Sequence, residues 1–139
     1  MANATHFYDQ AIETLPREEL RELQNVRLRA LIERIAGNQF YQEKTRAAGL
    51  ELSQIKCAED IRTLPFTTKQ ELVAEQVEHP PFGRLLTDPA SHYRYFHQTS
   101  GTTGRPLKVV DTAESWEWWK RCWGYVYRAA GVTADDVVF

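Results

Sequence analysis

The sequence has few cysteines, no histidine spacing typical of metal ligands and no long apolar runs. Each of these features argues against a class of protein. Among its 139 residues there are two cysteines, Cys57 and Cys122, and they do not form a CxxC pair. We therefore expect two reduced, partly buried thiols rather than a disulfide framework. The four histidines show no HExxH or similar spacing, so the sequence predicts no metal site.

Charge and apolar residues are distributed without extremes. The net charge is -2 with both signs mixed along the chain, which argues against nucleic acid as a partner. No apolar run is long enough to span a bilayer, so we expect no membrane partner. The first residues, MANATHFYDQ, lack a cationic patch followed by an apolar stretch. They therefore predict no secretory signal, and we expect a cytoplasmic protein.

Residues 1–79 are predicted to form a helical N-terminal segment. The clearest helix starts near Pro16 and ends with Gly37 as a left-handed cap. Its apolar stripe comprises Leu20, Leu23, Leu28, Leu31, Ile32 and Ile35. The stripe is wide enough that it would also suit a homodimer contact.

Two shorter helices are predicted to follow the first one. One runs over about 39–48 and ends at Gly49. Thr68 and Glu71 have the spacing of a capping box, which starts the other. Residues 80–91, rich in proline, are predicted to be a loop and a boundary.

Residues 92–139 are predicted to begin an α/β nucleotide-binding domain. Strands are expected at 92–97 and 107–110, and a helix is expected from 113 to about 130. The closing ADDVVF resembles the first half of a buried strand, so we expect a fragment of a longer protein. The predicted fold class is therefore α/β: a helical segment, then the first strands and helix of a truncated domain.

Aromatic residues gather in two places in this second part. Trp116, Trp119 and Trp123 share one helical face, and we expect core packing rather than a ligand box. Trp118 lies off that face, so it would pack against a neighbouring domain or be partly exposed. The run HYRYFH is interpreted as a buried strand rather than a base-stacking surface, because no basic groove accompanies it.

The stretch between the two expected strands, TSGTTG, is built from small hydroxyls and glycines. Gly101 and Gly104 permit positive φ and allow backbone amides to converge on an anion. Hydroxyl side chains would add further donors: Thr99, Ser100, Thr102 and Thr103. The loop lacks the GK[ST] ending of a Walker A motif. The sequence thus predicts a phosphate-binding loop, and the alternative is a solvated hairpin loop.

The segment TSGTTGRP, at 99–106, resembles the phosphate-binding signature of adenylate-forming enzymes, the acyl-CoA synthetase and ligase superfamily. Other segments resemble the N-terminal part of phenylacetate–CoA ligases: LQNVRLRALIERI and NQFYQEK within 23–44, LPFTTK within 60–72, and PFG at 81–83. His97 precedes the loop as in the HxSSGTTG form of that group. The resemblance covers nearly the whole chain.

The resemblance implies a ligase that uses ATP, Mg²⁺ and coenzyme A on a small carboxylic acid, with an aromatic acid suggested by the subgroup. The acid would form an acyl-adenylate and pyrophosphate, and the coenzyme A thiolate would then take the acyl group. The residues implied to hold the ATP phosphates are Thr99, Ser100, Gly101, Thr102, Thr103 and Gly104. His97 would contact the substrate or, alternatively, order the loop.

The chain departs from the superfamily pattern after the loop. Leu107 stands where lysine is often found, and Lys108 follows one residue later, on the opposite face of a strand. The adenine-binding segment, the magnesium-binding acid, the acyl pocket and the C-terminal lysine of the family have no counterpart in these residues. The catalytic residues are therefore unknown, and we expect the chain to require the rest of its own polypeptide for activity.

Two other functions stay open at this point. The first is a non-enzymatic helical interaction module that uses the apolar stripe, with the loop as a linker. The second is an adenylating enzyme that passes its acyl group to an acceptor other than coenzyme A.

Overall fold

The computed structural model describes residues 7–101 and 104–138, and this part of the chain is mostly helical with one two-stranded sheet. Two predicted phosphate-binding residues, Thr102 and Thr103, therefore lie outside the described residues. The α-helices are α1 (Gln10–Glu13), α2 (Arg17–Ile35), α3 (Gln39–Ala47), α4 (Lys69–Glu78) and α5 (Ala113–Ala129). The remaining elements are η1 (Leu52–Gln54), η2 (Ala58–Thr63), η3 (Ala90–His92), β1 (Tyr93–Gln98) and β2 (Lys108–Thr112).

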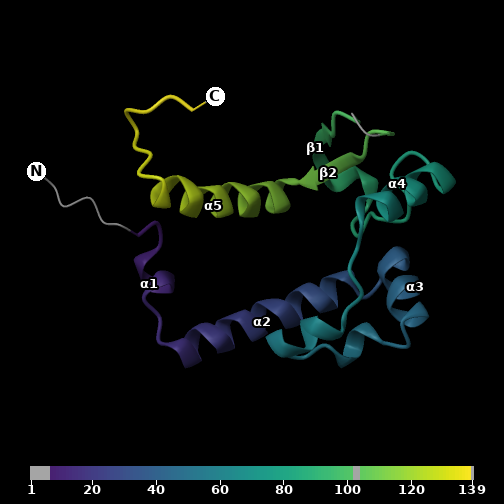
Figure 1. Ribbon diagram of the computed structural model, residues 1–139, viewed down its shortest axis with the longest axis horizontal. Coiled ribbons are helices and arrows are strands. Elements are labelled where there is room, and N and C mark those ends of the chain that lie inside the picture. Colours follow the sequence, from purple (N-terminus) through teal and green to yellow (C-terminus); the bar gives the residue numbers. More distant parts are fainter. Residues whose placement is uncertain (1–6, 102–103, 139) are drawn as a thin grey trace, which may run out of the picture.

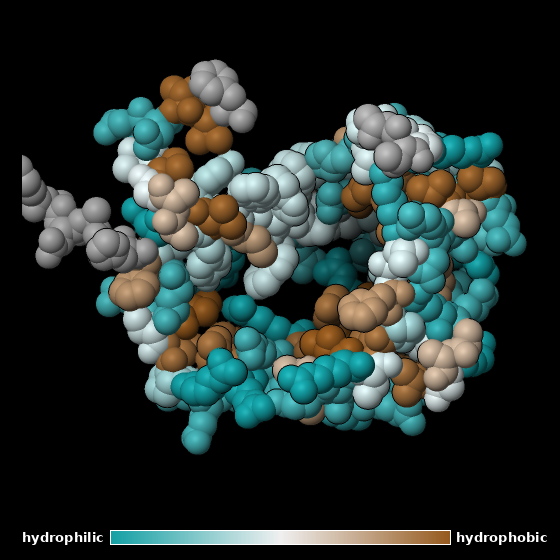
Figure 2. Space-filling model, in the orientation of Figure 1, coloured by the Kyte–Doolittle hydropathy of each residue, from teal (hydrophilic) through white to brown (hydrophobic). Residues whose placement is uncertain are grey.

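The long helices α2 and α5 form two sides of the molecule (Figure 1). The hairpin β1–β2 and α4 close one end, and α1 lies at the other end. Arg27 of α2 lies over the Trp118 ring of α5, 5.2 Å from its centroid. Between the two helices the molecule is hollowed, as Figure 2 shows, and a cavity of about 570 Å³ lies there.

The hydrophobic core is small and lies where α2 meets η1 and the residues after it. Its buried members are Ile32, Leu52 and Ile55. Partly buried side chains pack against them: Leu28, Ile35, Tyr41 and Leu64. Only part of the apolar stripe of α2 is used, because Leu31 is 53% exposed.

The predicted helix ends are confirmed with one exception. Thr68 and Glu71 form the capping box of α4, and Gly49 adopts a positive φ of 72° after α3. Gly37 was expected to be a left-handed cap, and this is wrong, because its φ is not positive. The chain turns directly into α3 instead, and the Asn38 N–H donates to the Ile35 carbonyl at 2.9 Å.

The expectation that the aromatic residues are buried is wrong for this chain. Within the described residues α5 has no buried residue, and Trp119 and Trp123 are both exposed. Strand β1 was expected to be buried, but it is exposed at every position after Tyr93. The physical reason is that the sheet has two strands, so within the described residues β1 is covered only in part, as where Tyr95 and His97 stack on Trp116.

The aromatic face of α5 is nevertheless ordered by stacking within itself. The Trp116 and Trp119 rings are stacked with centroids 5.0 Å apart, and Trp123 lies 5.5 Å from Trp119. Tyr95 of β1 stacks on Trp116 at 4.9 Å. We refer to these four residues, Tyr95, Trp116, Trp119 and Trp123, as the aromatic face.

The C-terminal segment differs from the sequence-based expectation. The expected strand at 134–139 is absent over the described residues up to 138, where Val137 is 75% exposed. A strand needs a neighbour for its backbone hydrogen bonds.

Cys57 is half-buried as expected, whereas Cys122 is exposed, and neither forms a disulfide. No helix in the described ranges has the length and apolar content that crossing a membrane requires.

Candidate functional site

The predicted phosphate-binding loop connects two antiparallel strands, as the sequence indicates. His97 pairs with Val109 and Gln98 pairs with Lys108 across the ladder. Two hydrogen bonds close the base of the loop: the Thr99 N–H donates to the Leu107 carbonyl at 3.0 Å, and the Leu107 N–H donates to the Thr99 hydroxyl at 2.9 Å. Thr99 therefore fixes the width of the loop with its side chain and backbone together.

Glycine is required at Gly101 by both backbone conformation and space. Its φ is 67°, and a Cβ there would lie 2.9 Å from the Gly104 carbonyl oxygen and 3.0 Å from the Pro106 nitrogen. Gly104 has a φ of 149°, and its N–H donates to the Gly101 carbonyl at 2.9 Å. The amides of Thr99 and Gly104 are thus already bonded inside the loop, whereas Ser100 is exposed. Contact between the loop and phosphate stays a prediction.

His97 borders the loop and is held by its neighbours. Its ring stacks on Trp116 with centroids 4.9 Å apart and an angle of 15° between the planes. Its Nε2 lies 3.7 Å from a carboxylate oxygen of Asp111. These contacts favour the interpretation that His97 orders the end of β1, over direct contact with a substrate.

A second element, α4, lies beside the loop. A cavity of about 310 Å³ separates them, and its lining residues are Lys69, Gln70, Val73, Ala74, Gly104 and Arg105. Lys69 and Arg105 are both exposed, so they supply positive charge on either side of this cavity. Sequence reasoning assigned no role to Lys69. Lys69 ends the LPFTTK segment and lies in the first turn of α4 on the same face as Val73, and these two features are the signals that could have indicated a role.

Lys108, the cation expected to have lost its phosphate contact, is half-buried on β2. Its backbone is bonded to α4, because the Gln76 side chain donates to its carbonyl at 2.7 Å and accepts from its N–H at 3.1 Å. The cations that line the cavity beside Gly104 are Lys69 and Arg105, and Lys108 is not among its lining residues.

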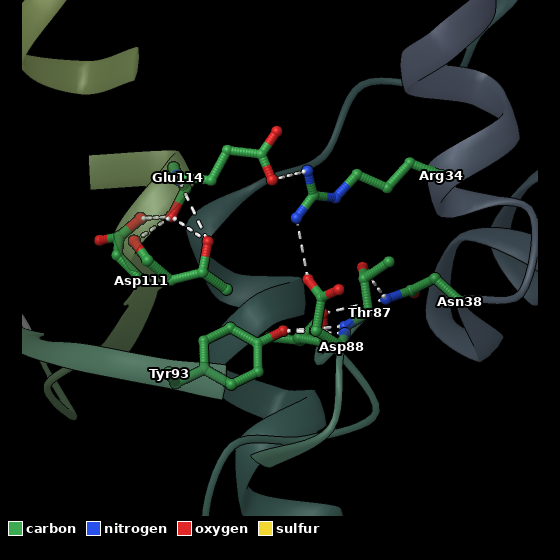
Figure 3. A network of polar contacts seen from close by, with 10 residues as sticks. Arg34, Asn38, Thr87, Asp88, Tyr93, Asp111 and Glu114 are labelled. Carbon is green, nitrogen blue, oxygen red and sulfur yellow. Dashed lines mark hydrogen bonds and ion pairs between the residues drawn. The ribbon is translucent and has the colours of Figure 1, made fainter. Parts of the chain in front are cut away.

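A network of polar contacts holds the hairpin and α5 to α2 (Figure 3). Arg34 of α2 donates to Glu114 at 2.8 Å and to Asp88 at 3.1 Å, and these bonds raise the pKa of the guanidinium. Tyr93 of β1 accepts from the backbone N–H groups of Thr87 and Asp88 at 3.0 and 3.2 Å. Residues 87–88 are thus bonded to both α2 and β1.

Asn38 anchors the same segment from inside. It is 2% exposed, and its Nδ2 donates to the Leu85 carbonyl at 2.9 Å and to the Thr87 hydroxyl at 3.2 Å. Its Oδ1 accepts from the Tyr41 N–H and so caps α3. The position of the hairpin relative to the helices therefore depends on Arg34 and Asn38.

Acidic residues do not gather into a metal site in the part of the chain that the structure describes. That part contains no group of three His, Cys, Asp or Glu residues able to hold a metal ion. We accordingly assign no magnesium ligand to the described residues.

Comparison with known proteins gives a consistent result. No protein-family model matches the chain. A phenylacetate-coenzyme A ligase of Thermus thermophilus is 39% identical over 106 residues, which are 73% of this chain and 22% of that protein. A phenylacetate-coenzyme A ligase of Escherichia coli is 32% identical over 128 residues, which are 91% of this chain and 28% of that protein. The chain thus spans less than a third of these relatives.

Solved structures agree with the sequence matches. A structure of 2-hydroxyisobutyryl-CoA ligase in complex with 2-HIB-AMP superimposes with a TM-score of 0.83 and 26% identity, covering 98% of this chain and 28% of that one. A second structure of that ligase, with 2-HIB-AMP and CoA, matches with a TM-score of 0.67 and 34% identity over 74% of this chain and 22% of that one. In sequence and in fold, the chain is therefore similar to the N-terminal part of phenylacetate–CoA ligases and related adenylate-forming acyl-CoA ligases.

Proposed function

We propose that the chain is the N-terminal part of an ATP-dependent ligase that converts a carboxylic acid into a CoA thioester through an acyl-adenylate. Its loop at 99–104 would hold the β- and γ-phosphates of ATP. The observation that carries the proposal is the glycine-dependent turn at Gly101, in a loop whose Gly104 lines a cavity together with Lys69 and Arg105. Positive φ at such a turn is costly for other residues and is maintained where function needs it.

In the proposed reaction the carboxylate attacks the α-phosphorus of ATP and releases pyrophosphate. Donors and cations that face the leaving phosphates stabilise charge that grows in the transition state. In this proposal Ser100, Lys69 and Arg105 would do this. Mg²⁺ would neutralise phosphate charge, and coenzyme A would accept the acyl group, both through residues outside this chain.

The chain is proposed to act together with the rest of its own polypeptide. The aromatic face of α5 and β1 is exposed although it is built from large rings, and Trp119 is 49% exposed. Exposed faces of this kind mark surfaces that another part of a protein covers. The relatives are more than three times as long as the matched region. We therefore expect the 139-residue chain alone to be inactive.

The test is ATP–pyrophosphate exchange by a ligase that contains this chain, with a panel of aromatic and aliphatic acids. We expect exchange with at least one acid, and strongly reduced exchange in a Gly101→Ala variant. Gly37→Ala is the matched control, because a Cβ added at Gly37 would have no atom within 4 Å. Absence of exchange with every acid would contradict the proposal. Formation of a CoA thioester, followed by mass spectrometry, separates coenzyme A from other acyl acceptors.

A non-enzymatic module is the second candidate, and the exposed part of α2 favours it. Val26 is 49% exposed and Leu31 is 53% exposed, so α2 could bind a partner helix. This candidate predicts that neither ATP nor pyrophosphate changes the melting temperature of the chain. The ligase proposal predicts that pyrophosphate raises it, because a ligand that binds the folded state alone stabilises that state.

A further inference from the structure

The side chain of Gln76 bonds to the backbone of β2 as a neighbouring strand would. Its Nε2 donates to the Lys108 carbonyl at 2.7 Å, and its Oε1 accepts from the Lys108 N–H at 3.1 Å. Gln76 is half-buried on α4 and lies 32 residues from Lys108 in the sequence. One primary amide therefore satisfies both backbone groups of a residue on an edge strand, groups that otherwise lack a partner in the sheet.

This contact lies at the exit of the loop. Lys108 follows Leu107, whose carbonyl and N–H are both bonded to Thr99 on the β1 side. Backbone groups alternate in direction along a strand, so Lys108 presents its groups to the opposite side, where Gln76 receives them. Leu107 and Lys108, where β2 begins, are consequently held from opposite sides.

The same helix face reaches the loop itself. Lys69, Val73 and Gln76 recur at the spacing of one face of a helix. Lys69 and Val73 line the cavity of about 310 Å³ together with Gly104 and Arg105. Gln76 is the member of this face with side-chain hydrogen bonds to the hairpin. It therefore sets how far Lys69 lies from Arg105.

We infer that Gln76 is a positioning residue for the phosphate loop: its amide fixes α4 against β2, so that Lys69 and Arg105 face one anion-sized cavity. The inference rests on the proposed function of the loop and adds to it a residue from outside the loop. Glutamine suits this task because its amide carries a donor and an acceptor side by side, as a peptide group does. Glutamate of the same size keeps the acceptor and loses the donor.

The test compares the 139-residue chain with Gln76→Ala and Gln76→Glu variants. Hydrogen exchange of the Lys108 amide reports the contact, and titration with inorganic pyrophosphate, followed by amide NMR signals of Ser100 and Gly104, reports the site. We expect faster exchange at Lys108 in Gln76→Ala and an affinity for pyrophosphate lowered about five-fold or more in both variants. The control is Gln24→Ala, because Gln24 is exposed on α2.

The midpoint of the pyrophosphate titration distinguishes a positioning role of Gln76 from a general loss of stability. A purely structural contribution weakens the apparent affinity only in proportion to the unfolded fraction, so it leaves the midpoint unchanged in samples that are fully folded. Positioning moves the midpoint in samples that circular dichroism shows to be folded. If the unaltered chain binds pyrophosphate and both variants bind it with the same midpoint, the inference is overturned and the proposed function stands. Where the unaltered chain shows no binding at millimolar pyrophosphate, the comparison is made in a ligase that contains the chain, and absence of both binding and ATP–pyrophosphate exchange there overturns the inference and the proposed function.

Discussion

Thr99 and Leu107 are bonded to each other twice across the base of the loop, once through backbone groups at 3.0 Å and once through the Thr99 hydroxyl at 2.9 Å. The hydroxyl therefore has a structural role that its place in a hydroxyl-rich loop does not reveal. Its oxygen accepts from the Leu107 N–H, and this role is separate from any donation by its O–H to a ligand.

Replacing Thr99 by valine tests this role. Valine keeps the branched shape and removes the acceptor, so the half-buried Leu107 N–H loses its partner. We expect the free energy of unfolding to fall by about 1 kcal/mol, the usual cost of losing such a bond. Serine keeps the hydroxyl, and Thr99→Ser should stay close to the unaltered chain in urea denaturation. Equal losses in both variants would contradict this role for the hydroxyl.

Gly101→Ala should distort the loop, because alanine is strained at a φ of 67° and its Cβ would lie 2.9 Å from the Gly104 oxygen. A residue forced into this region costs about 1–3 kcal/mol. Thermal denaturation and the chemical shifts of Gly104 measure the effect. Gly37→Ala is the control, since it has open space and no positive φ. Equal stability of the two variants would show that the turn tolerates a side chain.

Lys69 and Arg105 should each contribute to anion binding, because both line the cavity beside Gly104. Lys69→Gln and Arg105→Gln are expected to lower the affinity for pyrophosphate about five-fold each. The effect should weaken as salt is added, since both groups are exposed and screened. Isothermal titration at two ionic strengths measures it. Arg17→Gln, at an exposed position of α2, should bind as the unaltered chain does.

Asn38→Asp should destabilise the molecule, although aspartate is also a good helix cap. The change keeps the acceptor for Tyr41, removes the donors to Leu85 and Thr87, and places a carboxylate in a site that is 2% exposed. We expect a loss of about 2 kcal/mol or more in urea denaturation. Asn25→Asp is the matched control, because Asn25 accepts from the Ala58 N–H through its oxygen. A comparable loss in the control would contradict the assignment.

Local signals predicted the helices well, because caps depend on residues that are close in sequence. Thr68 with Glu71 is an example, and the two residues form the capping box that the sequence predicts. Burial could not be predicted in this way. Large rings at helical spacing indicate a shared face, but whether that face is buried depends on elements that the described chain does not contain.

The candidate site could likewise be predicted from the sequence only in part. Positive φ at Gly101 follows from the sequence, because the loop between two strands requires a tight turn. The bonds from Gln76 to Lys108 and the approach of Lys69 to Gly104 do not follow from it. They depend on how α4 packs against the hairpin, where Gln76 and Lys108 are 32 residues apart in the sequence, and neither the spacing nor the residue types of the loop indicate this.

Glu71 makes the stability of the start of α4 dependent on pH. Lys44, which bonds to its side chain, and the N–H and hydroxyl of Thr68 lower the pKa of Glu71 from 4.5 to about 2. A carboxylate with a lowered pKa contributes stability above its unfolded value and loses that contribution as pH falls toward the folded value. The chain should therefore lose this contribution progressively between about pH 4.5 and pH 2.

Glu71→Gln removes the charge and keeps the size and the cap geometry. We expect the variant to be less stable than the unaltered chain at pH 7, and the difference to shrink as pH falls from 4.5 toward 2, because the unfolded Glu71 carboxyl takes up its proton before the folded one does. Urea denaturation at a series of pH values measures the difference. Glu33→Gln, at an exposed position of α2, should show no such convergence. A difference that stays constant from pH 7 to pH 3 would mean that the ion pair of Glu71 with Lys44 contributes nothing to folding.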